Sequence, residues 1–400
     1  MARAGHSVTA ARQAMLECIA PLGSESVPLE LAAGRTLAEP VIAARAQPPL
    51  RSSAMDGYGV RSADSPSEAF IVAGEAAAGR PYVGPRLGAR GAVRIFTGAP
   101  VPDGVDRVVP QERARREGDA VWLEAPEPSR TNIREAGVDF VAGAVLAARG
   151  VRLSARRLGL IAASGAPAVR VTQRPRVALL ATGDEIVPPG TPAAPHQIYD
   201  SVSFALGASI AEWGGEALRL TGRPDAPAAI AAASGEGLER TDLLVIIGGA
   251  SVGDYDIVKS SLGGLGLSLI VERVAVRPGK PTWFGTAAGK PVLGLPGNPA
   301  AALVCAHLFL KPLLHAMLAQ DPCHGSSTAR LQAALPASGP DEWYLRSVSR
   351  AGEDAVLRTR PCDDQDTSLL SVFAAANTLI RRPAESSAAE RDALVEVLWL

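Results

Sequence analysis

The sequence predicts a multi-domain α/β protein built around a central parallel sheet. The chain has 400 residues, 47% of them hydrophobic, which is more than one ordinary domain contains. Short apolar runs at 177–181, 243–247 and 291–295 alternate with helical stretches, a pattern typical of parallel strands joined by helical crossovers. Strand-like runs separated by Gly/Pro-rich turns occupy 47–139 and the segment after residue 322, which indicates two further β-rich domains.

The order of these patterns indicates an insertion. Ser7 or Thr9 is expected to cap a first helix that ends near Ile19. The sequence then becomes strand-like at about residue 47 and returns to a helical, Leu-rich character after 140. The predicted domains are an N-terminal linker domain with a helical segment (1–46 and 140–173), the inserted β-rich domain (47–139), the α/β domain (174–322) and a C-terminal β-rich domain (323–400).

Composition narrows the expected partners. The formal net charge is −1, so no broad basic surface is expected and nucleic acid is not a predicted partner. The four cysteines form no C-x-x-C pair, which favours reduced thiols over a zinc site. Residues 1–20 lack a signal-peptide core, and the apolar run 300–310 is shorter than the roughly 20 residues of a membrane span. We therefore expect a cytoplasmic protein without a membrane anchor, with 300–310 a buried helix.

Each apolar run of the α/β domain ends in a distinctive loop. Parallel strands place their carboxyl ends at one edge of a sheet, where ligands bind. In the third loop, Asn298 can cap a helix and Pro299 can start it, leaving N–H groups for an anion. The segment GGASVG at 248–253 lacks the third-position glycine of the dinucleotide-binding motif G-x-G-x-x-G. Gly279-Lys280 is followed by Pro281 and not by Ser or Thr, so it does not form a P-loop. The three loops are TGDE at 182–185, GGASVGDYD at 248–256 and LPGNP at 295–299.

The loops concentrate negative charge at that edge. Carboxylates so placed repel one another unless a cation or a shared proton compensates them. Arg277, Lys280 and a hard ion such as Mg²⁺, which prefers carboxylate and phosphate oxygens, would compensate them. This predicts a phosphorylated or pyrophosphate-linked substrate. Taken singly, each acidic residue is equally consistent with an ordinary loop, and Asp56-Gly57 with a type I′ turn. The clustered carboxylates are Asp184, Glu185, Asp254 and Asp256.

Several distinctive segments occur in sequence over nearly the whole chain. They are PLRSSAMDGY at 49–58, TNIR at 131–134 with Gly137 and Asp139, ATGDE at 181–185, GGASVGDYD at 248–256, PGKP at 278–281, LPGNP at 295–299, and QDTS at 365–368 with Ala376-Asn377. S-A-M-D-G-Y together with L-P-G-N-P is a specific combination. In these segments and in their order, the chain resembles the molybdopterin molybdenumtransferase family, which includes the corresponding domain of gephyrin.

The resemblance implies a reaction and an assembly. The reaction is removal of AMP from adenylylated molybdopterin with insertion of molybdate into the dithiolene, using Mg²⁺, in molybdenum cofactor biosynthesis. The subunit would be elongated and form a homodimer, with the site in a cleft between the pterin-binding α/β domain of one subunit and parts of the other. Molybdopterin adenylyltransferase and recipient molybdoenzymes would be further partners.

The resemblance also assigns residues. The implied catalytic residues are Asp56, Asp139, Glu185 and Asp256, and the implied Mg²⁺ ligands are Glu185, Asp225 and Asp256. The carboxylates could place Mg²⁺, orient the attacking molybdate oxygen and manage protons at phosphorus. The implied residues that bind the pterin substrate are Thr182, Gly183, Asp184, Gly248, Gly249, Ser251, Gly253, Asp254, Arg277, Lys280, Pro296, Gly297, Asn298 and Pro299.

Four positions depart from the family pattern. Arg51 replaces a usual Asp, Val202 replaces a frequent Asn, and Pro224 replaces the first member of an acidic pair. Ile247 replaces a small hydroxyl residue, which removes an expected phosphate hydrogen bond. Two other functions stay open: a non-catalytic scaffold that carries the pterin, and the adenylyltransferase. The adenylyltransferase would need neither the inserted nor the C-terminal domain.

Overall fold

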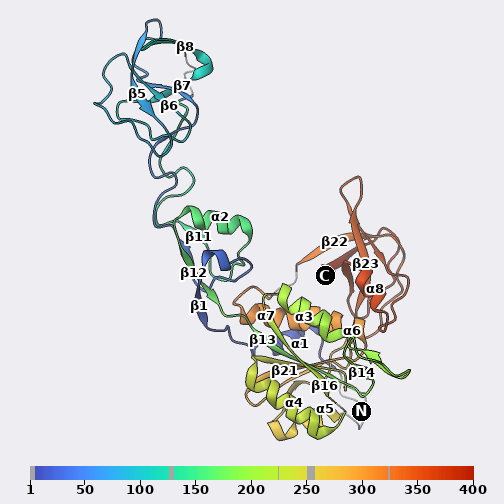
Figure 1. Ribbon diagram of the computed structural model, residues 1–400. Coiled ribbons are helices and arrows are strands. Elements are labelled where there is room, and N and C mark those ends of the chain that lie inside the picture. Colours follow the sequence, from blue (N-terminus) through green and yellow to red (C-terminus); the bar gives the residue numbers. More distant parts are fainter. Residues whose placement is uncertain (1–4, 126–129, 224, 250–256, 323–324) are drawn as a thin grey trace.

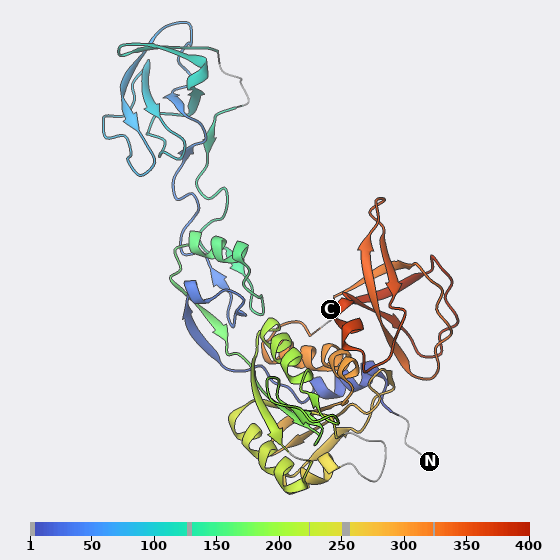
Figure 2. The same ribbon diagram turned by 45° about the vertical axis from the view of Figure 1, so that its right-hand side comes forward.

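The computed structural model describes residues 5–125, 130–223, 225–249, 257–322 and 325–400. The molecule is elongated, with a β-rich module at one end and a larger body at the other (Figure 1). The body contains the α/β module and the C-terminal β-rich module. A narrow neck joins the body to the distant module, and a view turned by 45° shows the same separation (Figure 2). The chain runs up the neck and returns along it, as expected for an insertion.

Antiparallel strand pairs build the neck. The pair β1–β12 runs in register from Ser24↔Thr172 to Pro28↔Ala168. Arg35 is almost fully buried beside this pair, where it donates to the Thr172 carbonyl (3.0 Å) and forms an ion pair with Glu25. The elements are β1 (Ser24–Pro28), η1 (Leu29–Leu31), β2 (Val41–Ile42), β11 (Val145–Ala147), α2 (Ala155–Ala163) and β12 (Ala168–Thr172).

The first helix belongs to the body rather than to the neck. Helix α1 (Val8–Leu16) is capped as expected, since the Ser7 hydroxyl accepts from the Ala10 N–H (3.2 Å), and it ends before Ile19. Its buried face joins the same hydrophobic core as the central strands, which differs from its predicted place in the N-terminal linker domain. Burial decides this placement, because the helix presents Val8, Ala11 and Met15 to that core.

A six-stranded sheet of order β7-β4-β6-β5-β9-β8 forms the distant module, and the short pair β3–β10 lies at its base. Gly57 lies inside β4, and a Cβ there would come within 2.0 Å of the Val109 carbonyl oxygen. Asp56-Gly57 therefore enters a strand and is not a type I′ turn. The elements are β3 (Ser52–Ser53), β4 (Gly57–Val60), β5 (Phe70–Ala76), β6 (Gly91–Ile95), β7 (Arg107–Pro110), η2 (Gln111–Arg113), β8 (Ala114–Glu117), β9 (Ala120–Leu123) and β10 (Ile133–Arg134).

The central sheet has the order β16-β13-β17-β21-β20-β18. Its first four strands are parallel, as predicted. Two antiparallel strands, β20 and β18, extend it. Ala288 and Gly289 both adopt positive φ (49° and 75°) and close a two-residue hairpin that reverses the chain between β20 and β21. The elements are β13 (Arg176–Thr182), β14 (Ile186–Val187), β15 (Ile198–Tyr199), α3 (Val202–Glu212), β16 (Glu216–Arg223), α4 (Pro227–Arg240), β17 (Leu243–Ile247), α5 (Ile257–Ser261), η3 (Gly263–Leu265), β18 (Ser268–Val271), β20 (Trp283–Ala287) and β21 (Lys290–Leu295).

One continuous helical segment crosses the body. It consists of α6 (Pro299–Cys305), the π-helical turn η4 (Ala306–Leu310) and α7 (Lys311–Met317). By length and composition alone this segment could span a membrane, but 83% of its most apolar 18-residue stretch is buried inside the protein. The buried helix predicted at 300–310 is present, and it continues past Pro312.

The C-terminal module shares a strand with the α/β module. Its sheet has the order β19-β23-β24-β22-β26-β25, and its first strand comes from the body, where β19 (Val276–Arg277) pairs in parallel with the start of β23. The Glu342 N–H donates to the Ala275 carbonyl (3.0 Å), which extends this connection. The other elements are β22 (Ser326–Leu331), β23 (Glu342–Ala351), β24 (Leu357–Pro361), α8 (Leu370–Ala375), β25 (Thr378–Arg382) and β26 (Leu394–Trp399).

Close packing in the central sheet yields a stability prediction. A Cβ on Gly294 would lie 1.9 Å from Nε1 of the fully buried Trp283. Gly294→Ala should therefore lower the free energy of unfolding by about 1–3 kcal/mol through overpacking. Gly235→Ala is the matched control within helix α4, where the nearest atom is 3.9 Å away. It should raise stability by about 0.5–1 kcal/mol. Thermal and denaturant unfolding would measure both, and an unchanged Gly294→Ala protein would contradict the packing described.

Candidate active site

The three predicted loops meet at one cavity of about 1100 Å³ at the carboxyl edge of the central sheet. The turn after β19 and residues of the C-terminal module complete its wall. Of the predicted site residues, those that line it are Thr182, Gly183, Glu185, Asp225, Gly248, Gly249, Arg277, Lys280, Pro296, Gly297, Asn298 and Pro299. Asp184 is exposed and does not line it, and Ser251, Gly253, Asp254 and Asp256 fall outside the described residues, as does Pro224.

The loop after β13 carries Glu185 at the exposed rim of this cavity. Gly183 has φ +133°, and a Cβ there would come within 2.6 Å of the Glu185 carboxylate, so the side chain lies folded back over the glycine. Thr182 ties this loop to the next, because its hydroxyl donates to the Ile247 carbonyl (3.3 Å). This hydrogen bond joins the ends of β13 and β17, where the two loops begin.

A second carboxylate lies partly buried beside Glu185. The Asp225 N–H donates to Asp184 (3.0 Å), while the buried Asp225 Oδ1 atom has no hydrogen-bond partner among the described residues. Burial, and then repulsion by Asp184 and Glu185, raises the pKa of Asp225. No group of three acidic, His or Cys side chains in the described ranges is arranged as a finished metal site. The unpaired oxygen and the like-charged neighbours nevertheless suit a hard cation.

Arg277 and Lys280 also line the cavity, at the end of β19 and on the turn that follows it. Lys280 forms an ion pair with Asp341 (3.3 Å). The Arg277 guanidinium stacks over Trp343, 4.7 Å from the ring centroid. The turn itself is tightly held. Gly279 has φ +113°, a Cβ there would come within 2.0 Å of the Cys305 sulfur, and its carbonyl accepts from the Thr282 hydroxyl (2.7 Å).

The LPGNP loop differs from the prediction in one respect. Asn298 does occupy the N-cap position of α6, but its side-chain amide makes no cap and donates to the Thr367 hydroxyl instead (2.8 Å). The Ala300 N–H, expected to be free for an anion, donates to the Thr367 carbonyl (3.0 Å). The reason is that a loop of the C-terminal module covers the start of the helix. The predicted anion site at this helix terminus is therefore at least partly occupied by protein.

The remaining two predicted acidic residues lie away from the cavity. Asp56 is in the distant module, where its Oδ1 atom accepts from the N–H and the hydroxyl of Thr97 (both 2.7 Å). These two hydrogen bonds, with a smaller contribution from Arg94, hold the pKa of Asp56 below its ordinary value. Asp139 is exposed on the neck, where its N–H donates to the Gln47 carbonyl (3.0 Å). One chain therefore does not bring all the predicted acidic residues together.

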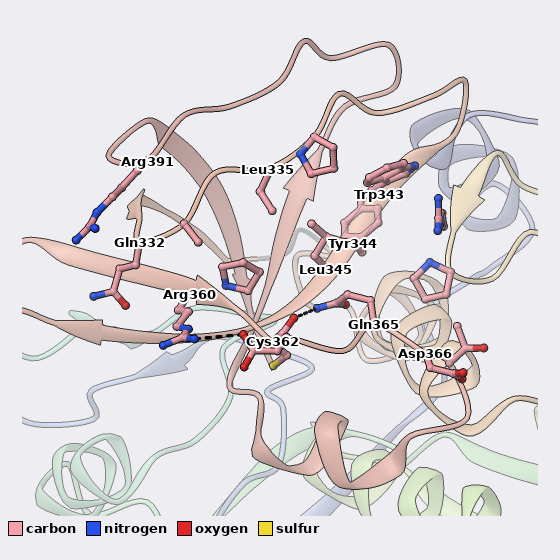
Figure 3. A pocket seen from close by; sticks show the side chains of 17 residues that line it. Gln332, Leu335, Trp343, Tyr344, Leu345, Arg360, Cys362, Gln365, Asp366 and Arg391 are labelled. Atoms are coloured by element: carbon pink, nitrogen blue, oxygen red, sulfur yellow. Dashed lines mark hydrogen bonds and ion pairs between the residues drawn. The ribbon is translucent and has the colours of Figure 1, made fainter.

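A second cavity, of about 1030 Å³, lies in the C-terminal module beside the first. Figure 3 shows Arg391, Gln332 and Arg360 at one end of it and Trp343 at the other. Both cavities are lined by Arg277, Pro278 and Thr367, so they meet at the turn after β19.

Sequence reasoning missed Thr97, Asp341 and Trp343. Thr97 is 41 positions from Asp56, and Asp341 is 61 positions from Lys280. Each stands alone in a β-rich stretch, so no local pattern indicates its role.

Comparisons with known proteins agree with this architecture. Residues 6–165 match the sequence profile of the MoeA N-terminal region (domain I and II), and residues 178–316 match that of a probable molybdopterin binding domain. A molybdopterin molybdenumtransferase from Haemophilus influenzae is 33% identical over 92% of both chains. One from a Nostoc species is 38% identical over 73% of this chain and 69% of its own. The chain belongs to the molybdopterin molybdenumtransferase family.

A solved structure extends the likeness to the whole fold. A molybdopterin biosynthesis MoeA protein from Pyrococcus horikoshii has a TM-score of 0.85 at 29% identity, covering 99% of both chains. The family's multi-domain α/β architecture, predicted from the sequence, is therefore confirmed.

Three of the four residues that depart from the family pattern lie in the described part of the chain. Ile247 and Val202 both line the cavity and are almost fully buried. Arg51 pairs with Glu135 (3.4 Å) and donates to the Val105 carbonyl (3.3 Å), so it connects segments at the base of the distant module.

The hydrogen bonds to Asp56 yield a pH prediction. Thr97→Val removes the hydroxyl donor and leaves the N–H, so the pKa of Asp56 should rise toward its ordinary value and protonation should occur at higher pH. Carbon-13 titration of labelled aspartate in the full chain would measure the shift, with the signal assigned by its loss in Asp56→Asn. Thr131→Val, in the same region, is the matched control. Equal Asp56 titration in both variants would contradict the assignment.

Proposed function

We propose that this chain is a molybdopterin molybdenumtransferase that removes AMP from adenylylated molybdopterin and inserts molybdate into the dithiolene, with Mg²⁺ as a required ion. The observation that carries this proposal is the cavity that Arg277, Lys280, Glu185 and Asp225 line together. A pyrophosphate-linked pterin needs cations for its phosphates and carboxylates for a divalent ion. Relatives that bear the corresponding enzyme name match most of the chain.

The chain's own residues divide the work by charge. Arg277 and Lys280 would neutralise phosphate oxygens through charge-assisted hydrogen bonds. Glu185 and Asp225, with Asp256 from the loop outside the described residues, would hold Mg²⁺. When bound, Mg²⁺ would withdraw charge from the phosphate oxygens as AMP leaves. Burial, and then the negative neighbours, raise the pKa of Asp225, so a bound cation would favour its ionised form.

Asp56 and Asp139 require a second copy of the chain in this proposal. Asp56 belongs to the module beyond the neck, whereas Glu185 lines the cavity in the body (Figure 1). We propose a homodimer in which the distant module of one subunit brings Asp56 to the cavity of the other. Asp56, whose ionised form is favoured by its Thr97 hydrogen bonds, would then accept a proton or orient the molybdate oxygen.

The alternative functions are less well supported by the cavity. A stand-alone adenylyltransferase would not need the C-terminal module, yet Asp341, Thr367 and Ser368 from that module line the wall. A passive pterin carrier would not need a partly buried carboxylate with an unpaired oxygen. We further propose that the enzyme works in the cytoplasm, takes its substrate from the adenylyltransferase and serves molybdoenzymes.

The proposal predicts a loss of chemistry without a loss of fold for Glu185→Gln. An amide cannot carry the charge that holds a metal ion, so single-turnover AMP release should fall about 100-fold or more. Glu185 is exposed, so the melting temperature should shift little. Glu239→Gln is the matched control, an exposed carboxylate on α4 that does not line the cavity. If Glu185→Gln releases AMP at the parent rate, the role of Glu185 is refuted. If the parent protein itself releases no AMP, the proposed function is refuted.

A further inference from the structure

Both cations of the cavity are held by one short segment of the C-terminal module. We propose that Asp341 and Trp343 determine the affinity of the cavity for its anionic ligand, with opposite effects. Asp341 would compete with the anion for Lys280, and Trp343 would orient Arg277 toward it. This inference rests on the proposed function only for the identity of the anion, a phosphate ester.

The backbone fixes this segment against the cations. Strand β23 pairs in parallel with β19, so that Glu342 lies opposite Val276 and Trp343 lies opposite Arg277. The Glu342 N–H also donates to the Ala275 carbonyl (3.0 Å). Residues 341 and 343 therefore lie on either side of a residue whose position is set by backbone hydrogen bonds. The backbone pairing that joins the two modules therefore places Asp341 and Trp343 beside Lys280 and Arg277.

Asp341 is placed to oppose an anion. Its carboxylate lies 3.3 Å from Lys280 Nζ and lines the cavity. The lysine side chain is 54% exposed, so the ion pair adds little to the stability of the fold. A phosphate that binds Lys280 must share it with this carboxylate or displace it. A fixed negative charge beside a phosphate site weakens binding and accelerates release of an anionic product.

Trp343 acts on the other cation. The Arg277 guanidinium lies over its ring at 4.7 Å, and stacking leaves the N–H groups at the edge of the guanidinium available to an oxyanion. Arg277 is exposed, so its long side chain would otherwise sample many rotamers. Trp343 lies at one end of the second cavity (Figure 3), and Arg277 lines both cavities. The ring thus serves as a platform that positions Arg277.

The two residues therefore predict opposite changes in affinity. Asp341→Asn removes the competing charge and keeps the shape, so it should tighten AMP binding about fivefold at low salt, and less at about 0.5 M salt. Trp343→Leu removes the platform and should weaken AMP binding severalfold, whereas Trp343→Phe keeps an aromatic face and should restore most of it. The control is Asp363→Asn. Asp363 pairs with Arg360 (3.2 Å) in the same module but does not line the first cavity.

Calorimetric titration of the full-length chain with AMP would test the proposal. We expect Asp341→Asn to tighten binding, Asp363→Asn to change nothing, and Asp341→Asn to lose its effect when Lys280 is already alanine. Unchanged or weaker binding by Asp341→Asn would overturn the role of Asp341, as would equal tightening in the Lys280→Ala background. Weak binding by both Trp343→Leu and Trp343→Phe would overturn the role of Trp343. Absence of AMP binding to the parent would overturn both roles.

These outcomes are separable from those of the proposed function. AMP binding needs neither molybdate nor turnover, so the affinity changes could hold even if no AMP is released from adenylylated molybdopterin. Conversely, a parent that releases AMP while Asp341→Asn binds AMP no more tightly would leave the function intact and reject the role of Asp341.

Discussion

The neck is the constraint on which the rest of this structure depends. Its β1–β12 ladder and the buried Arg35 fix the two connecting segments side by side, and the Gln320 amide on the body donates to the Thr36 hydroxyl (2.5 Å) at its foot. The distant module is consequently held away from the body, as both views show. In a single chain, the Asp56 carboxylate, which accepts two hydrogen bonds from Thr97, and the cavity that Arg277 and Lys280 line stay apart. A function that uses both requires two chains.

A second connection, at the other side of the body, gives the cavity its electrostatic character. Because β19 is shared with the C-terminal sheet, residues from two modules form one wall. Carboxylates from the α/β loops share the cavity with cations, and the C-terminal module supplies a counter-charge for Lys280 and an aromatic ring beneath Arg277. In the proposed account, affinity for a phosphate ester depends on Arg277, Lys280, Asp341 and the ring of Trp343. The same arrangement suits a site that must release an anionic product.

Local sequence patterns predicted much of this structure, and they failed where long-range packing decides. The strands at 177–181 and 243–247 follow from the pattern of apolar residues, and the Ser7 cap follows from capping chemistry. All three features are present. The placement of α1 depends on which surface buries its apolar face, and no local pattern contains that information. The side-chain direction of Asn298 depends on Thr367, a residue of another module. Thr97, Asp341 and Trp343 act only through partners that folding brings near, so the sequence alone could not single them out.

The central claim is that one complete site draws its residues from two chains, and subunit mixing tests it most directly. Asp56→Asn and Glu185→Gln proteins would be purified separately, then mixed and allowed to exchange subunits before AMP release is measured. A mixed dimer has one site in which both residues are intact, so the account predicts that activity returns to a substantial fraction of the parent value, while each variant alone stays inactive. A mixture that exchanges subunits, as shown by differently tagged chains, yet remains inactive would contradict the account.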